Sequence, residues 1–267
     1  MKALCFTVDL DRDVNIQVPG KAQAGSLDRG AGTEPRFSSS EKGLEVLLDV
    51  LGETGVQATF FAEGRTLETI SSRGLSRHEV GIHGYDHEDL TSLSGHDLRM
   101  SMSRAVAAVR RVVNRSPVSF RAPYMKVNDA VLCALPEFGI KYDSSEYAPL
   151  GASILPRRLP CGVAELPVPE GLDSSGRKIA AYLWPMHEGK RQPEDYVRMA
   201  SEVRGGVFVL ATHTWHMVES RDRGPMGAAE ASKNAKNVQK TIEGIIDLGF
   251  EPTTVSEAVR HAEALRG

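Results

Sequence analysis

The chain has 267 residues, a formal net charge of −3, and 41% hydrophobic against 25% charged residues. This is the composition of a globular protein, and the length suits one α/β barrel domain over residues 1–267. The small negative charge and the absence of a long basic run argue against a nucleic-acid partner. No apolar stretch approaches the ~20 residues that a membrane span needs.

The cysteines and the N-terminus indicate the compartment. Cys5, Cys133 and Cys161 are odd in number and scattered, which favours a reducing environment over a disulfide framework. The opening MKALCFTVDLD contains an apolar run that is too short for a signal peptide and lacks a small-residue cleavage site. We therefore expect a cytoplasmic protein, with a homo-oligomer as the base-rate expectation.

Strand-like and helix-like segments alternate along the chain. The predicted strands cover 3–8, 56–64, 78–84, 119–124, 140–145, 164–169, 179–184 and 206–215, and the predicted helices cover 38–55, 94–114, 129–138, 193–204 and 228–248. Ser39 or Ser40 is expected to cap the first helix, and Ser94 the second. This alternation predicts βαβ units, a mostly parallel sheet and a barrel, regular or irregular.

One segment interrupts the alternation. Residues 12–40 are rich in Gly and Ser and leave directly after the first strand. A loop at this position of a βα barrel borders the active site. We expect the insertion to form part of a substrate cleft, and a solvated loop without substrate contact is the alternative.

Polar residues collect where the predicted strands end, which is where βα architectures place their chemistry. Each residue alone has an ordinary structural explanation, such as a solvated strand end or a satisfied core histidine. Their placement on one rim is what indicates a catalytic site. The residues are Asp9, Asp11, His83, His87, Arg121, Tyr124, Asp143, His213, Trp215 and His216.

The chemistry of this set suits a metal ion. Two neutral imidazoles and one carboxylate form a facial ligand set that suits Zn²⁺ or another divalent ion and leaves positions open for water and substrate. His83 and His87 supply the imidazoles, and either Asp9 or Asp11 supplies the carboxylate. The other aspartate stays free to take a proton from water.

The chain resembles the polysaccharide deacetylases with a NodB-homology domain, carbohydrate esterase family 4, over nearly its whole length. HEVGIHGYDH at 78–87 is the most specific match. The other matching segments are VDLD at 8–11, ATFFAEG at 58–64, FRAPY at 120–124, KYDSS at 141–145, AELPV at 164–168, VLATH at 209–213 and GFEPTTVSEAV at 249–259. The resemblance implies a single-domain irregular (β/α)7 barrel.

The resemblance also implies roles for the first half of the rim. Asp9 would be the general base, and Arg121 would hold it by a charge-assisted hydrogen bond. Asp11, His83 and His87 would be the metal ligands.

On the other side, His213 would be the general acid that protonates the departing amine. Tyr124 lies in the segment whose backbone N–H would help bind the oxyanion, and Asp143 would tune the acid side. His216 competes with His213 for the acid role. Trp215 would stack on a sugar ring or belong to the core.

Some positions depart from the family pattern. The first motif reads DLD rather than adjacent aspartates followed by glycine. Which of Asp9 and Asp11 is the base and which is the metal ligand is therefore left open. RAPYM lacks the glycine after its tyrosine, and no Trp-Asp pair follows Asp143. His78 lies upstream of the rim set and is assigned a structural role.

The expected function is a metal-dependent hydrolase that removes an N-acetyl or N-formyl group from an amino sugar or saccharide. The nearest rival is a hydrolase of a small linear or cyclic amide on the same scaffold. A saccharide-binding barrel without catalysis is the non-enzyme alternative. A binder has no need for both Asp9 and His213, which favours the enzyme.

Overall fold

The computed structural model describes residues 2–11, 37–150, 154–221 and 223–264. Within these residues, seven parallel strands form one curled sheet that stays open between its first and last strand. In sheet order they are β11 (Gly206–His213), β1 (Lys2–Leu10), β2 (Thr59–Ala62), β3 (Glu79–Ile82), β4 (Ser119–Phe120), β5 (Tyr142–Asp143) and β8 (Ala164–Glu165). The predicted irregular (β/α)7 barrel is confirmed.

Shorter strands complete the sheet and form two small ones. β7 (Arg157–Arg158) pairs antiparallel with β8, and β14 (Glu251–Pro252) pairs with β1. A three-stranded sheet contains β10 (Lys178–Ala180), β9 (Val168–Leu172) and β6 (Tyr147–Pro149), and a hairpin contains β12 (Glu219–Ser220) and β13 (Gly224–Pro225). The predicted strand at 179–184 is therefore divided: its first residues belong to β10 of the side sheet, and Tyr182 forms an isolated parallel bridge with Ala211 of β11.

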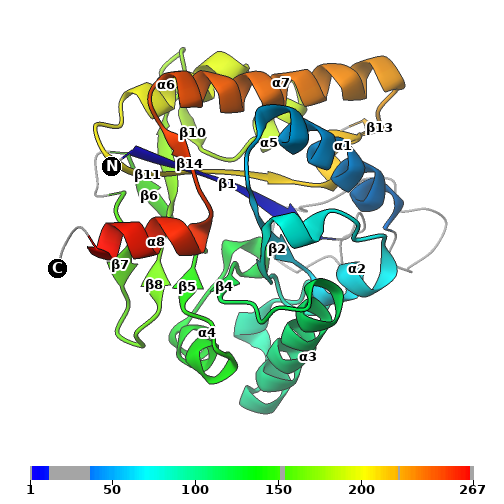
Figure 1. The fold of residues 1–267 in the computed structure, drawn as a ribbon, viewed down its shortest axis with the longest axis vertical. Helices are drawn as coiled ribbons and strands as arrows, with labels where there is room; N and C mark the ends of the chain where they lie inside the picture. The colour runs from blue at the N-terminus through cyan, green and yellow to red at the C-terminus, as the bar shows by residue number, and fades with distance from the viewer. Residues whose placement is uncertain (1, 12–36, 151–153, 222, 265–267) are drawn as a thin grey trace.

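The helices surround the strands (Figure 1). They are α1 (Ser38–Thr54), α2 (Gly64–Thr69), α3 (Gly95–Val113), α4 (Asp129–Ala134), α5 (Trp184–His187), α6 (Pro193–Ser201), α7 (Ala228–Asp247) and α8 (Val255–Ala264), with 3-10 turns at Leu75–Arg77, Leu90–Ser92, Pro123–Met125, Leu135–Phe138 and Trp215–Met217. No described helix combines the length and the apolar character of a membrane span.

Ser94 caps α3 as predicted, because its hydroxyl accepts a hydrogen bond from the backbone N–H of Asp97. The cap prediction for α1 is wrong, since Phe37 is its N-cap residue and makes no side-chain cap bond. Both serines lie inside the helix, after the N-cap residue, and their hydroxyls donate to other elements. Ser39 donates to the carboxylate of Glu219, and Ser40 donates to the carbonyl of Asp11.

The predicted insertion at 12–40 ends earlier than expected, because residues 38–40 belong to α1. Residues 12–36 lie outside the described part of the chain, so the expectation that they form a substrate cleft stays a prediction.

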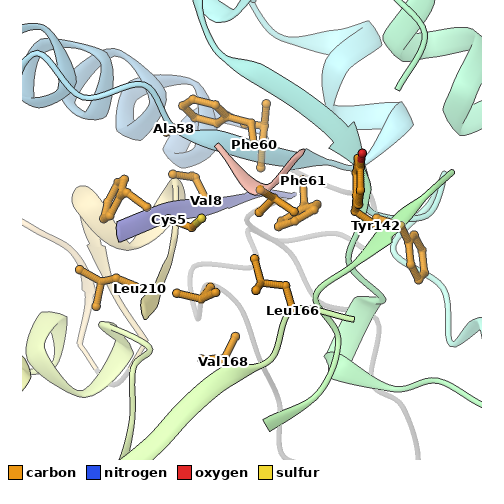
Figure 2. Close-up of a cluster of buried hydrophobic side chains, with 14 of the residues drawn as sticks. Cys5, Val8, Ala58, Phe60, Phe61, Tyr142, Leu166, Val168 and Leu210 are labelled. Carbon is orange, nitrogen blue, oxygen red and sulfur yellow. The ribbon is translucent and has the colours of Figure 1, made fainter. Parts of the chain in front are cut away.

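The barrel core lies around β1 and β2 (Figure 2). Every residue of β1 after Lys2 is buried, and so is all of β2. A continuous apolar run of this kind is typical of a central parallel strand that is covered on both faces. Phe60 and Phe61 point to opposite faces of β2 and are both fully buried. The core thus holds β1 rigidly, including the carboxyl end that carries Asp9.

α1 packs closely against the backbone that follows β11. A methyl group on Gly43 would lie 1.9 Å from the carbonyl oxygen of Thr214, the residue after His213. Only glycine permits this approach, and α1 thereby supports the turn beside the strand end. Gly52, in the same helix, is exposed and has no atom within 4 Å of a built methyl.

We predict that Gly43→Ala lowers the free energy of unfolding by about 1–3 kcal/mol, the typical cost of overpacking. Gly52→Ala is the matched control and should stabilise the helix by about 0.5–1 kcal/mol. Urea unfolding of both variants measures the difference. Equal effects of the two substitutions would contradict the close packing of α1.

Candidate active site

The strand register brings the predicted rim residues together. Asp9 on β1 lies directly opposite His213 on β11 and opposite Phe61 on β2. His83 and Arg121 each follow the last residues of β3 and β4, which are neighbouring strands. Because parallel strands end at the same edge of a sheet, side chains from four strands meet there.

Arg121 is the centre of this edge, and it is fully buried. Its Nη1 donates to Asp9 Oδ1 and to Thr7 Oγ1, each at 3.0 Å. Its Nε and Nη2 donate to the carbonyl and hydroxyl oxygens of Ser144 at 2.8 and 2.9 Å. The guanidinium also lies over the ring of Phe61, 4.5 Å from its centroid. The predicted contact between Arg121 and Asp9 is present.

The second oxygen of Asp9 is bound by Tyr182. The Tyr182 hydroxyl donates to Asp9 Oδ2 at 2.5 Å and lies 3.1 Å from His213 Nε2. It reaches this position because residues 181–183 run beside β11, where Ala211 N donates to Ala181 O and Leu183 N donates to Ala211 O. Sequence reasoning missed Tyr182, since it lies inside a predicted strand rather than at its carboxyl end.

These partners keep Asp9 ionised. Burial alone would raise the pKa of Asp9, but Arg121, then His83 and His213, and the Tyr182 hydrogen bond lower it to about 2. Both oxygens of the carboxylate are also fixed in place. Asp9 is therefore an oriented anion at neutral pH that can accept a proton.

Asp11, His83 and His87 form the group suited to a metal ion. Their ligand atoms all lie within 4.8 Å of one another, and all three residues are buried. His87 Nε2 lies 3.3 Å from Asp11 Oδ2. His83 Nδ1 donates to the carbonyl oxygen of Arg121 at 2.8 Å, which leaves Nε2 as the lone-pair nitrogen for a ligand.

The carboxylate of Asp11 supports the fit to a cation. Burial raises the pKa of Asp11 to about 6, although His213 and His83 lower it in part. Asp11 Oδ1 is buried and has no hydrogen-bond partner among the described residues. A divalent ion would supply the missing positive charge, and two imidazoles with one carboxylate suit Zn²⁺.

Three residues of this region, His87, Tyr124 and Met125 (φ 53°), adopt left-handed backbone conformations that residues other than glycine rarely take. His87 has φ 51° and Tyr124 has φ 60°, and their rings meet edge to face with centroids 4.7 Å apart. Such strain in non-glycine residues collects at functional sites. The oxyanion role of the Tyr124 segment stays a prediction.

The two candidate acids have different surroundings. His213 lines the cavity, whereas His216 is fully buried behind it, stacked on His187 with centroids 5.2 Å apart. His216 Nε2 lies 3.1 Å from Glu188 Oε1. This placement favours His213 for the acid role. Burial lowers the pKa of His213, against the opposing effects of Asp11 and Asp9.

A cavity of about 320 Å³ opens over this edge of the sheet. Trp215 is buried with its ring centroid 5.3 Å from that of His213, which favours core packing over stacking on a sugar. Trp184 is the less buried indole in the wall. The lining residues are Asp9, His83, His87, Tyr124, Met125, Tyr147, Ala180, Tyr182, Trp184, Pro185, His213, Trp215 and Arg221.

His78 lies at the other end of β3, as expected for a structural residue. Its Nδ1 accepts a hydrogen bond from the N–H of Ala58, and its ring packs against Phe60.

Both the sequence and the fold of the chain are similar to those of known polysaccharide deacetylases. The polysaccharide deacetylase family profile matches residues 26–142. Over these residues the chain is similar to polysaccharide deacetylases. A chitin deacetylase of Colletotrichum lindemuthianum is 36% identical over 88 residues, which are 30% of this chain and 36% of that protein. The matched segment spans about a third of the length of several curated relatives.

Solved structures share the fold over almost the whole chain. One from Mycobacterium smegmatis, provisionally described as a polysaccharide deacetylase, has a TM-score of 0.69 at 23% identity and covers 99% of this chain and 91% of its own. A CE4 family pseudoenzyme from Bacillus anthracis has a TM-score of 0.54 at 14% identity, covering 97% and 65%. The chain has the NodB-type irregular barrel. The second neighbour illustrates that this fold alone does not imply activity.

The structure does not bring Asp143 to the acid side. Among the described residues it makes no hydrogen bond or ion pair with His213, and it is absent from the cavity wall. It hydrogen bonds Ser145 at 2.5 Å and lies opposite Glu165 in the neighbouring strand. The expected tuning role therefore has no contact that supports it.

Asp143 and Glu165 instead form a buried carboxyl pair. Burial, and then Asp143 itself, raises the pKa of Glu165 well above its usual range, and burial raises the pKa of Asp143 to about 6. Among the described residues, Asp143 Oδ2 and Glu165 Oε2 are buried without a geometric hydrogen-bond partner. A proton shared between the two carboxyl groups accounts both for the missing partners of these oxygens and for the raised pKa values.

This pair predicts a pH effect on stability. The folded chain holds the proton more tightly than the unfolded chain, so the free energy of unfolding falls as pH rises from about 4 through 6 and above. Glu165→Gln should flatten this decline, measured by urea unfolding between about pH 5 and 8 with a chelator present.

Glu53→Gln, on the exposed face of α1, is the matched control and should keep the wild-type slope. A Glu165→Gln slope equal to that of wild type would show that the two carboxyls do not share a proton.

Proposed function

We propose that the protein is a metal-dependent hydrolase that removes an N-acetyl or N-formyl group from an amino sugar or saccharide. One observation carries the proposal. The three ligand atoms of Asp11, His83 and His87 lie within 4.8 Å of one another, beside the cavity in which Asp9 is held by Arg121. A metal position and an ionised base thus face the same space.

Asp11, His83 and His87 would hold Zn²⁺ or another divalent ion. When bound, such an ion polarises an amide carbonyl and lowers the pKa of water. His83 is oriented for this role by its hydrogen bond to the carbonyl of Arg121. Such partners fix the ring and its tautomer.

Asp9 would take a proton from the attacking water. Its two oxygens are each engaged by a donor, Arg121 at 3.0 Å and Tyr182 at 2.5 Å, so the carboxylate stays oriented during the reaction. Arg121 and Tyr182 are positioning residues in this scheme. Arg121 also supplies the positive charge that keeps Asp9 from binding the cation in place of Asp11.

His213 would protonate the departing nitrogen, and the backbone N–H near Tyr124 would stabilise the negative charge on the carbonyl oxygen. The hydrogen bond between Tyr182 and His213 links the proton acceptor to the proton donor. A barrel that only binds saccharide has no use for this link, which supports an enzyme over a binding module.

Paired substitutions separate metal binding from proton transfer. His87→Ala should lose both the bound metal and amine release, because two ligands hold Zn²⁺ poorly, while the fold is kept. Asp9→Asn should keep one metal per chain and slow amine release from an N-acetyl saccharide by about 10²–10⁴-fold. Metal content and fluorescamine detection of amines measure the two effects.

If His87→Ala retains its metal, the ligand assignment is wrong. If Asp9→Asn loses the metal while Asp11→Asn keeps it, the two aspartates exchange roles.

Tyr182→Phe removes only the hydroxyl between Asp9 and His213. A hydrogen bond to a charged group contributes about 1.5–3 kcal/mol, so we expect kcat to fall about tenfold to a hundredfold with the metal retained. Tyr147→Phe is the matched control, because Tyr147 lines the same cavity and its hydroxyl makes no hydrogen bond in the described part of the chain. An equal fall in kcat in both variants would exclude a positioning role for Tyr182.

A further inference from the structure

Besides the group of Asp11, His83 and His87, the cavity has a wall with a positively charged side chain. Arg221 lines the cavity, with its guanidinium carbon 5.1 Å from the ring centroid of Trp184. Tyr147 and Pro185 line the same space. The deacetylation chemistry proposed above uses none of these four side chains.

No carboxylate among the described residues pairs with the side chain of Arg221. In the described part of the chain its guanidinium forms no ion pair and no hydrogen bond, and only its backbone N–H donates, to Glu188 Oε1 at 2.5 Å. The carboxylate of Glu188 is engaged further by His216 and by the hydroxyl of Ser220. Glu188 is thus directed into the buried network behind the cavity.

Other arginines nearby differ in this respect. Arg223 pairs with Glu230, and Arg191 pairs with Asp173 at 2.8 Å. Arg223 is also absent from the cavity wall. An unpaired guanidinium facing a cavity with an aromatic wall is a ready-made partner for an anion, because its planar donors match carboxylate and phosphate oxygens.

We propose that Arg221 binds an anionic group, a carboxylate or a phosphate, carried by the substrate. This inference rests on the proposed function, in which the acyl group lies between Asp9 and His213. The same cavity then holds the anion at Arg221 and the body of the sugar against Trp184 and Tyr147. The substrate class is an acidic or phosphorylated N-acyl sugar rather than a neutral one.

Binding to the hydrolysis-blocked Asp9→Asn protein, loaded with Zn²⁺, tests the subsite by calorimetry. The probes are N-acetylmuramic acid for a carboxylate, N-acetylglucosamine 1-phosphate for a phosphate, and neutral N-acetylglucosamine. At least one anionic probe should bind about tenfold or more tightly than the neutral one, as a charge-assisted contact provides. The anionic probe that binds more tightly identifies the group.

Adding Arg221→Gln to this protein should reduce the preference to about threefold or less. Adding Arg223→Gln, whose side chain is exposed and paired outside the cavity, should retain it. Thermal unfolding of each variant checks the fold. Equal binding of charged and neutral probes, a preference that survives Arg221→Gln, or no binding of any probe would overturn the subsite.

Amine release from the same probes, measured with the protein in which Asp9 is intact, tests the proposed deacetylase function separately from the anion subsite. An anion preference without release of amine from any probe refutes the deacetylase and leaves the subsite standing. Release from the neutral probe without an anion preference refutes the subsite alone.

Discussion

The buried pair of Arg121 and Asp9 is the interaction on which the site depends. A guanidinium with no exposed surface is costly to remove from water, and it persists here because Thr7, Asp9 and Ser144 accept its hydrogen bonds. Removing one partner of such a pair typically costs 3–5 kcal/mol. Through its backbone carbonyl the same residue orients His83. One arginine thereby positions both Asp9 and His83.

The division between Asp9 and Asp11 follows from this pair. Asp9 has a donor on each oxygen, and its neighbours lower its pKa to about 2. Asp11 has no such donor on Oδ1, and burial raises its pKa to about 6. The DLD motif therefore contains one carboxylate with a donor on each oxygen and one with an oxygen that has no partner among the described residues. Asp9 lies in β1 and Asp11 directly follows this strand, and of the two only Asp9 accepts a hydrogen bond from Arg121.

Much of the site was predictable because it obeys a simple topological rule. Asp9, His83, Arg121 and His213 lie at the carboxyl ends of strands in one parallel sheet, and short apolar runs mark those strands in the sequence. The fold class follows from the same alternation. Strand-end position, however, does not fix side-chain direction. Asp143 also ends a strand, but it faces Glu165 within the barrel.

The residues that sequence reasoning missed depend on long-range contacts. Tyr182 enters the site because its segment crosses beside β11, which no local pattern signals. Ser39 and Ser40 fit the pattern of helix caps, yet they bond Glu219 and the carbonyl of Asp11. Arg221 lies in a loop far along the chain and meets the cavity only through the fold.

A crystal structure of the zinc-loaded protein, with anomalous diffraction measured at the zinc edge, tests the central assignment most directly. We expect one ion bound by a carboxylate oxygen of Asp11 and by Nε2 of His83 and of His87, with Asp9 still bonded to Arg121 and Tyr182. An ion bound by Asp9 in place of Asp11, or an anomalous peak away from these histidines, would contradict the assignment of base and ligands.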